Sequence, residues 1–262
     1  MLTPAEIAAS FLTVGETKAA LPLKKMFLLA LLAGAYVALA GVGATTAAAT
    51  VENGSLAKLI SACVFPAGLA MVLFAGSELF TGNCLMVVAR LERRITTAGL
   101  VRNWTVVYLG NALGGIAAAA LAVYSHTPSL FGGALARSMV SIAEGKAALG
   151  FADAFLRGIL CNFLVCLAVW MAAGAKEVGG KLAALYFPIL LFVLCGYEHC
   201  VANLYYLPAG AFAAAEYGIA SSLTWGGCLK NLLAVTLGNI VGGALLGAIY
   251  RGAYLKTDKP RA

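Results

Sequence analysis

The sequence predicts an all-α integral membrane protein with six transmembrane helices, arranged as two inverted three-helix repeats whose second and fifth helices are broken. Three observations support this prediction. Of the 262 residues, 62% are hydrophobic and 11% are charged, and the mean hydropathy is +0.92. A folded domain in water would not tolerate so apolar a surface. In addition, six apolar stretches are long enough to cross a bilayer, and one polar pattern occurs twice within them.

The six apolar stretches run over residues 26–50, 59–89, 104–124, 150–173, 182–213 and 228–250. The second and the fifth are too long for one straight helix, because about 20 apolar residues suffice to cross a bilayer. Both contain charged and amide side chains near their middle. We therefore expect both helices to break inside the membrane and then to resume.

The polar groups of these two long stretches follow one pattern, Gly-x-Glu-x-x-x-x-Asn. It occurs at residues 76–83 and recurs 120 residues later at 196–203. A second shared pattern, Gly-Asn-x-x-Gly-Gly, begins at Gly110 and at Gly238. Since each copy holds three spans, the second copy enters the membrane from the opposite side. The repeats, at about 25–124 and 150–250, are therefore predicted to be inverted, an arrangement that places transport sites at the repeat interface.

The N-terminal stretch, residues 1–24, is expected to be an amphipathic helix on the cytoplasmic membrane surface. Thr3-Pro4-Ala5-Glu6 is a capping-box pattern with proline at the first helical position. Ile7, Ala8, Phe11 and Leu12 follow at helical spacing and give this helix an apolar face. We expect the whole chain, 1–262, to form a single membrane domain.

Basic residues are distributed unevenly between the two sides of the predicted bundle. Thirteen lie before the first span, between spans two and three, between spans four and five, and after span six. The other loops and span ends hold five, namely Lys58, Arg137, Lys146, Arg157 and Lys230. Because cytoplasmic loops are enriched in Lys and Arg, both termini and the tail 251–262 are predicted to face the cytoplasm. A net charge of +7 spread in this way indicates topology and no nucleic-acid partner.

Cysteines and tryptophans give two further expectations. All seven cysteines fall in the predicted spans and none forms a Cys-x-x-Cys pair, so we interpret them as packing groups. We expect no disulfide, metal ion or cofactor. Trp104, Trp170 and Trp225 fall near span ends, as side chains at a membrane–water interface do.

Ionisable and polar groups at bilayer depth are candidates for function. His199 is interpreted as a pore residue, with a hydrogen-bonded core histidine as the alternative. Thr81, in the other break, offers a hydroxyl to a passing anion or to His199, or simply caps its own helix. Glu78 and Glu198 either accept hydrogen bonds from the broken backbone, which is the interpretation we favour, or line the lumen.

Buried amides accompany these groups. Asn83, Asn203, Asn111 and Asn239 are expected to satisfy backbone groups freed by the breaks, whereas Asn162 is a candidate for direct substrate contact. A helix that resumes inside the bilayer presents unpaired N–H groups and the positive end of its dipole. Two such ends that meet from opposite sides predict a site for a small anion.

Three motifs carry a family resemblance: Glu78-Leu79-Phe80-Thr81-Gly82-Asn83, the run from Arg157 to Trp170 that contains Cys161-Asn162, and Gly196 to Asn203. In these motifs, and over residues 5 to 250, the chain resembles the formate/nitrite transporter family. The resemblance implies an aquaporin-like fold and a homopentamer in which each protomer has its own pore. It implies small weak-acid anions as substrates, namely formate, nitrite, hydrosulfide and sometimes acetate or lactate. It also implies a bacterial or archaeal cell (inner) membrane.

The resemblance also assigns roles to residues. His199 corresponds to the central pore histidine, and Thr81 to the threonine of the loop that breaks the second span. The remaining pore residues are Leu69, Leu79 and Phe80 at the cytoplasmic constriction, Phe65, Val165 and Phe192 at the outer one, Lys146 in the outer vestibule and Asn162 in the pore wall.

These expectations predict a channel or transporter in which a weak acid, most simply formate, crosses with a proton at His199. A bare anion in an apolar constriction costs several kcal/mol, whereas the neutral acid avoids that cost. Nitrite or hydrosulfide remains an alternative, as does an aquaporin-like channel for neutral solutes, although Asn-Pro-Ala motifs are lacking. An enzyme using Glu198, His199 and Cys200 is disfavoured, because adjacent helical side chains point about 100° apart.

Overall fold

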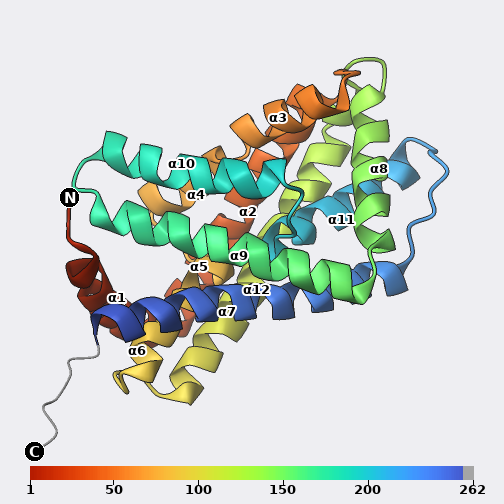
Figure 1. Ribbon diagram of the computed structural model, residues 1–262. Coiled ribbons are helices and arrows are strands. Elements are labelled where there is room, and N and C mark those ends of the chain that lie inside the picture. The colour runs from red at the N-terminus through yellow and green to blue at the C-terminus, as the bar shows by residue number, and fades with distance from the viewer. Residues whose placement is uncertain (256–262) are drawn as a thin grey trace, which may run out of the picture.

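The computed structural model describes residues 1–255, and in this part of the chain all regular structure is helical (Figure 1). The elements are α1 (Pro4–Ala20), α2 (Leu23–Ala48), α3 (Gly54–Val64), α4 (Ala67–Phe74), α5 (Phe80–Asn83), η1 (Cys84–Met86), α6 (Val87–Leu91), α7 (Thr97–Tyr124), η2 (Thr127–Ser129), α8 (Ala134–Ala148), α9 (Phe151–Gly174), α10 (Val178–Leu194), α11 (Cys200–Glu216) and α12 (Trp225–Tyr254). Of the predicted tail, Lys256, Lys259 and Arg261 lie outside the described residues.

The long helices have the length and composition of membrane spans. α2, α7, α9 and α12, together with the stretch Gly54–Phe74 that joins α3 to α4, have mean hydropathies between 1.8 and 2.1. The apolar stretches Phe80–Leu91 and Val178–Leu194 are shorter, as expected for parts of broken spans. The protein is therefore an all-α, multi-pass integral membrane protein.

Both predicted breaks are present. The first lies between Phe74, where α4 ends, and Phe80, where α5 begins; the second lies between Leu194 and Cys200. Gly76 and Gly196 stand at matching places in the two breaks and have φ angles of +76° and +68°. This left-handed conformation strains any residue with a Cβ, which explains why each pattern begins with glycine.

Close helix contacts place one asparagine behind each break. A Cβ on Gly114 of α7 would lie 2.0 Å from the carbonyl oxygen of Leu31, and one on Gly242 of α12 would lie 2.1 Å from that of Ile159. Only glycine permits this approach between α7 and α2, and between α12 and α9, which run side by side (Figure 1). The shared motif Gly-Asn-x-x-Gly-Gly thus combines close packing with an asparagine on the same helix.

The segment between the third and fourth spans contains a helix that the sequence analysis did not predict. This helix, α8, packs against α11 through Leu135, Met139, Val140 and Ala143, which are all buried (Figure 1). Its other face is polar, so its sequence is not apolar enough to be predicted as a membrane span. α8 carries Lys146, one of the predicted site residues.

The apolar face of α1 lies against the protein and not in a membrane surface, which corrects the expectation from its sequence. Ile7, Ala8 and Phe11 are buried, and Phe11 stacks on Trp170 with ring centroids 4.9 Å apart and an interplanar angle of 1°. The capping box of Thr3 and Glu6 is present as predicted. Trp170 is 3% exposed and is therefore a docking partner for α1, not an interfacial side chain.

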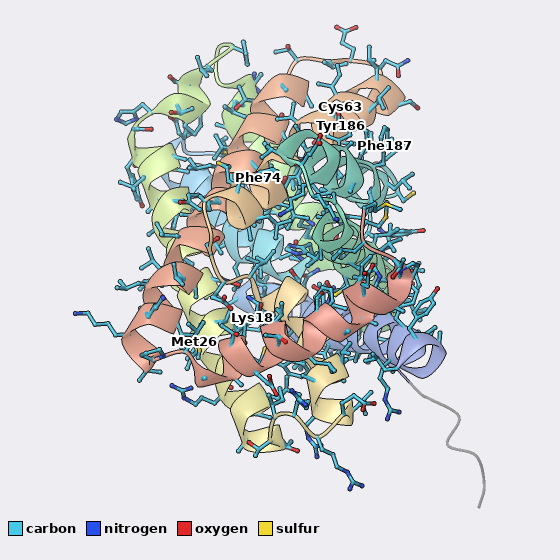
Figure 2. All side chains as sticks on the ribbon, turned by 90° about the vertical axis from the view of Figure 1, so that its left-hand side faces the viewer. Lys18, Met26, Cys63, Phe74, Tyr186 and Phe187 are labelled. Carbon is cyan, nitrogen blue, oxygen red and sulfur yellow. The ribbon has the colours of Figure 1, made fainter. Side chains whose placement is uncertain are left out.

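The broken spans also contact each other directly. α3 packs against α10, and the Tyr186 hydroxyl donates to the Cys63 carbonyl oxygen at 3.2 Å where these helices meet (Figure 2). Phe65 and Phe192 meet edge to face across the same contact, with ring centroids 5.7 Å apart. The two halves of the chain are thus joined through the helices that contain the breaks.

Candidate functional site

The two breaks meet at one polar contact in the interior. Thr81 Oγ1 and His199 Nε2 lie 2.9 Å apart, and the two residues are 0% and 4% exposed. Thr81 comes from the start of α5, and His199 is the N-cap residue of α11. The structure therefore brings together two side chains that are 118 residues apart, both of which the sequence analysis singled out.

The hydrogen bonds of His199 define its tautomer. The backbone N–H of Ala202 donates to Nδ1 at 3.0 Å, so Nδ1 carries a lone pair and no proton. The ring is then neutral with its proton on Nε2, and Nε2 donates to Thr81 Oγ1. Within residues 1–255 the Thr81 hydroxyl has no other side-chain partner, so its own proton is free for a solute. Phe192 covers the ring at a centroid distance of 5.8 Å.

Two asparagines satisfy the backbone at the breaks. Oδ1 of Asn111 accepts from the N–H of Phe80 at 2.9 Å, while its Nδ2 donates to the carbonyl oxygens of Glu78 and Ala30 at 2.9 and 2.7 Å. Asn239 repeats this arrangement with the N–H of Cys200 and the carbonyl oxygens of Glu198 and Gly158, at 2.9, 3.0 and 2.8 Å. These amides hold the non-helical segments on either side of the Thr81–His199 contact.

The carboxylates have different partners from those expected. Glu78 accepts from Lys18 Nζ at 2.7 Å and from Asn83 Nδ2 at 2.7 Å, and Asn83 also donates to Asn103. The prediction that Glu78 and Glu198 accept hydrogen bonds from the broken backbone is wrong, and so is the prediction that the side chains of Asn83 and Asn203 satisfy it. Their partners are side chains, because Asn111 and Asn239 already occupy the freed backbone groups.

The second repeat contains the same four-residue chain. Glu198 accepts from Lys146 Nζ at 2.9 Å and from Asn203 Nδ2 at 2.7 Å, and Asn203 donates to Asn231 at 2.8 Å. Asn231 in turn donates to the backbone carbonyl of Lys146. Each carboxylate is thus paired with a lysine and fixed by an amide, as buried charges require.

Three members of these chains were missed as site residues. Lys18, Asn103 and Asn231 had no role assigned, although Lys18 precedes Lys146 by 128 residues and Asn103 precedes Asn231 by the same interval. The motif pair at Gly110 and Gly238 is also separated by 128 residues. That second interval was the available signal.

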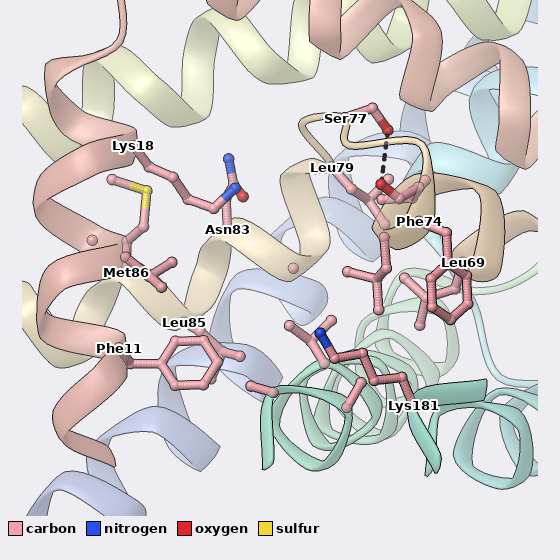
Figure 3. Close-up of a pocket in the computed structure, with 18 residues that line it drawn as sticks. Phe11, Lys18, Leu69, Phe74, Ser77, Leu79, Asn83, Leu85, Met86 and Lys181 are labelled. Atoms are coloured by element: carbon pink, nitrogen blue, oxygen red, sulfur yellow. Dashed lines mark hydrogen bonds between the residues drawn. The ribbon is translucent and has the colours of Figure 1, made fainter. Parts of the chain in front are cut away.

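A vestibule of about 250 Å³ approaches the contact from the side of α1; we name it the α1 vestibule (Figure 3). Leu69 and Leu79, the residues predicted for the cytoplasmic constriction, line it together with Lys18, Asn83 and Lys181. Phe80 is absent from its lining. The Phe80 ring instead packs edge to face on Trp104 and Tyr108, with centroid distances of 6.2 and 5.0 Å.

A vestibule of about 430 Å³ lies on the other side, beside α8; we name it the α8 vestibule. His199, Phe65 and Phe192 line it, and so do Lys146 and Glu198. The apolar Phe65–Phe192 pair and the polar His199 ring therefore share one wall. Thr81 is fully buried and lines neither vestibule.

Val165 and Asn162 of α9 are buried and lie outside both vestibule linings. Nδ2 of Asn162 donates to the carbonyl oxygens of Thr81 and Asn239 at 3.2 and 2.6 Å. Both amide hydrogens are therefore engaged, and Asn162 joins the Thr81 segment to α12. Among residues 1–255, no three His, Cys, Asp or Glu side chains gather in a way that would hold a metal ion.

These features define a class of protein: a membrane channel or transporter in which two interrupted helices place a hydrogen-bonding pair between two vestibules, each with apolar side chains in its lining. Residues 5–252 match the family model described as Formate/nitrite transporter. The chain therefore belongs to the formate/nitrite transporter family, which consists of channels and transporters and not of enzymes.

Individual relatives support this membership. The chain is 38% identical over 263 residues to the transporter YrhG of Bacillus subtilis, covering 98% of this chain and 96% of that protein. It is 40% identical over 247 residues to the formate channel FocA of Haemophilus influenzae, covering 88% and 87%. A solved structure of a pentameric formate channel with formate bound matches with a TM-score of 0.81 and 36% identity, over 89% of this chain and 98% of that one.

Proposed function

We propose that this protein is a channel that conducts formate together with a proton across the cell (inner) membrane of a bacterium or archaeon. The observation that supports this proposal most directly is the Thr81–His199 contact between two vestibules that each have apolar side chains in their lining. The names of the relatives agree with it, because formate channels are among them. By analogy with the pentameric formate channel, we propose a homopentamer with one pore in each protomer.

The apolar walls favour a neutral permeant. Leu69 and Leu79 on one side, and Phe65 and Phe192 on the other, offer no hydrogen bonds to an anion that has lost its water. Such a transfer costs several kcal/mol for a charge and much less for the neutral acid. Desolvation also raises the proton affinity of a carboxylate. A formate ion that moves toward this region therefore takes up a proton and continues as formic acid.

The neutral tautomer of His199 supports a hydrogen-bonding role for this residue over that of a proton donor. A neutral imidazole would have to gain a proton at Nδ1 before it could release one, and that would displace the Ala202 N–H. We infer that the proton comes from water in the vestibule. The free hydroxyl proton of Thr81 then offers a donor to the acid as it passes, while the Nε2–H of His199 holds the Thr81 oxygen in place.

The lysines of the two vestibules set the local potential. Lys18 and Lys146 each lie within 3 Å of a buried glutamate, so the positive charge of each of these two lysines is paired. Such a pair attracts an anion weakly and releases it readily, which suits permeation. With both termini in the cytoplasm, the α1 vestibule faces inward and the α8 vestibule faces outward.

The test is the flux of formate, nitrite and hydrosulfide into proteoliposomes under imposed pH gradients, with internal pH recorded at the same time. We expect formate uptake to be fastest when the outside is acidic, with one proton entering for each formate. His199→Phe should reduce formate permeability strongly, and His199→Asn less, because an amide restores one donor. Formate uptake that generates a membrane potential and leaves internal pH unchanged would contradict the mechanism. A larger flux of nitrite or hydrosulfide would reassign the substrate.

A further inference from the structure

The α8 vestibule holds three cationic side chains from three elements, and only one of them is neutralised. Lys146 is paired with Glu198 at 2.9 Å. Lys58 of α3 and Arg157 of α9 also line the vestibule, and within residues 1–255 neither lies within 4 Å of a carboxylate. The pair of Lys146 and Glu198 cancels, so the vestibule carries two excess positive charges.

These two cations lie at the second break. The ammonium of Lys58 is 4.0 Å from the position that a Cβ on Gly196 would occupy. The backbone carbonyl of Arg157 accepts from the N–H of Glu198 at 3.3 Å. Both residues thus border the segment that ends in His199, and a solute held by them has the pore histidine next in its path.

A polar route leads to them from outside. A second cavity, of about 430 Å³, shares Ser61, Ser141 and Ile142 with the α8 vestibule and is also lined by Arg137. The hydroxyls of Ser61 and Ser141 make no hydrogen bond within the described residues. Cationic groups and free hydroxyl donors therefore line the outer approach as far as the break.

The α1 vestibule is built differently. Lys18 is paired with Glu78, and Lys181 of α10 is the one further cation in its lining (Figure 3). The two vestibules thus differ in excess charge even though the buried lysine–glutamate pairs repeat. We use this difference as an internal control.

We propose that Lys58 and Arg157 form an anion-binding station in the α8 vestibule that captures a planar carboxylate before it meets His199. A guanidinium binds both oxygens of a carboxylate through two parallel N–H donors, and an ammonium adds a point charge. Charges of one sign in a cleft with low-dielectric walls raise the local concentration of a counter-ion by about 10-fold to 1,000-fold. The proposal rests on the proposed function for the identity of the anion, whereas the station itself is defined by charge.

The first experiment measures the local potential without any flux. Ser61→Cys supplies a thiol between the two cavities, in a background in which the exposed Cys63 and Cys195 are replaced by serine. We compare its reaction rates with an anionic and a cationic methanethiosulfonate reagent. The ratio of anionic to cationic rate should fall about tenfold or more when Lys58→Met and Arg157→Met are combined. Lys181→Met, in the other vestibule, should leave the ratio unchanged. An unchanged ratio in the double variant would overturn the proposal.

The second experiment measures formate flux from each side, in right-side-out and inside-out vesicles. The double variant should raise the half-saturation concentration for formate presented at the α8 vestibule, with little change from the α1 side. Arg157→Lys keeps the charge but removes the fork, so half-saturation should rise for formate and not for hydrosulfide. An equal change from both sides would refute a station at this vestibule. If the wild type moves no formate at all, the proposed function fails, and the reagent ratio still decides whether the station exists.

Discussion

Replacement of Asn239 by alanine is the sharpest test of how the second break is held. Asn239 is 0% exposed and makes three hydrogen bonds, to the N–H of Cys200 and to the carbonyl oxygens of Gly158 and Glu198. At about 0.6 kcal/mol for each bond, the average for interhelical bonds in a membrane protein, the loss would be about 2 kcal/mol. At about 1–3 kcal/mol for each buried group left unpaired, it would reach up to about 9 kcal/mol.

The structure favours a value between these limits. The N–H of Cys200 and the carbonyl of Glu198 belong to fixed backbone at a break, so they cannot find new partners by a change of rotamer, whereas the carbonyl of Gly158 lies within α9. The α8 vestibule, however, reaches Glu198 and His199 and can admit water to part of the segment. We therefore expect Asn239→Ala to lower the free energy of unfolding by about 3–5 kcal/mol.

The assay is reversible unfolding in mixed micelles, followed by tryptophan fluorescence, with two matched controls. Asn111→Ala removes the same three types of bond in the first repeat and should cost a similar amount. Asn53→Ala removes an exposed N-cap of α3 and should cost about 1 kcal/mol. A loss below that of Asn53→Ala would refute the account of the break.

Function should separate the two asparagines. Asn239 binds the backbone on both sides of His199, whereas Asn111 binds the backbone on both sides of Leu79. At equal stability loss, Asn239→Ala should reduce formate flux more than Asn111→Ala. Equal effects on flux would mean that His199 orientation is not limiting.

Three further predictions concern other parts of the molecule. Thr81→Val keeps the shape of the side chain but removes the oxygen that accepts from His199, so its formate flux should fall about tenfold although the protein remains folded. Thr81→Ser keeps the hydroxyl, so its formate flux should stay near that of the wild type. Phe11→Ala removes the ring stacked on Trp170 and should weaken the packing of α1 on the protein by about 3 kcal/mol, so limited proteolysis should cleave α1 faster. Leu23→Ala, at an exposed position, should not accelerate cleavage. Hydrogen bonds from the serines of the α11–α12 loop lower the pKa of Glu144, so this contact stabilises the loop above the unfolded pKa near 4.5 and is lost as pH falls through the lower folded pKa. The protection factor for hydrogen exchange in that loop, which corrects for the slower intrinsic exchange in acid, should therefore fall in acid in the wild type. A Glu144→Gln protein whose protection factor falls in the same way would contradict this.

Some features of the site were readable from the sequence because they are local. A glutamate and an asparagine inside an apolar run are costly in lipid, and a glycine beside them permits a turn. Their presence in residues 76–83 and 196–203 therefore indicates a break wherever the run lies in the fold. The same argument identified His199 and Thr81 as candidates. The apolar composition and the repeated motifs likewise determined the class, an all-α membrane protein built from two related halves.

What the tertiary structure decided is which groups meet. The repeat interval of 120 residues aligns His199 with Leu79, not with Thr81, so the central contact lies outside the internal symmetry and only the packing of the two halves reveals it. Glu78 and Glu198 are paired with lysines that lie 60 and 52 residues away in sequence, on α1 and α8. The orientation of Phe80 toward α7 likewise depends on a neighbouring helix. The chemistry of a side chain is fixed by its residue type and can be read from the sequence. The groups that it contacts depend on long-range packing, which only the tertiary structure gives.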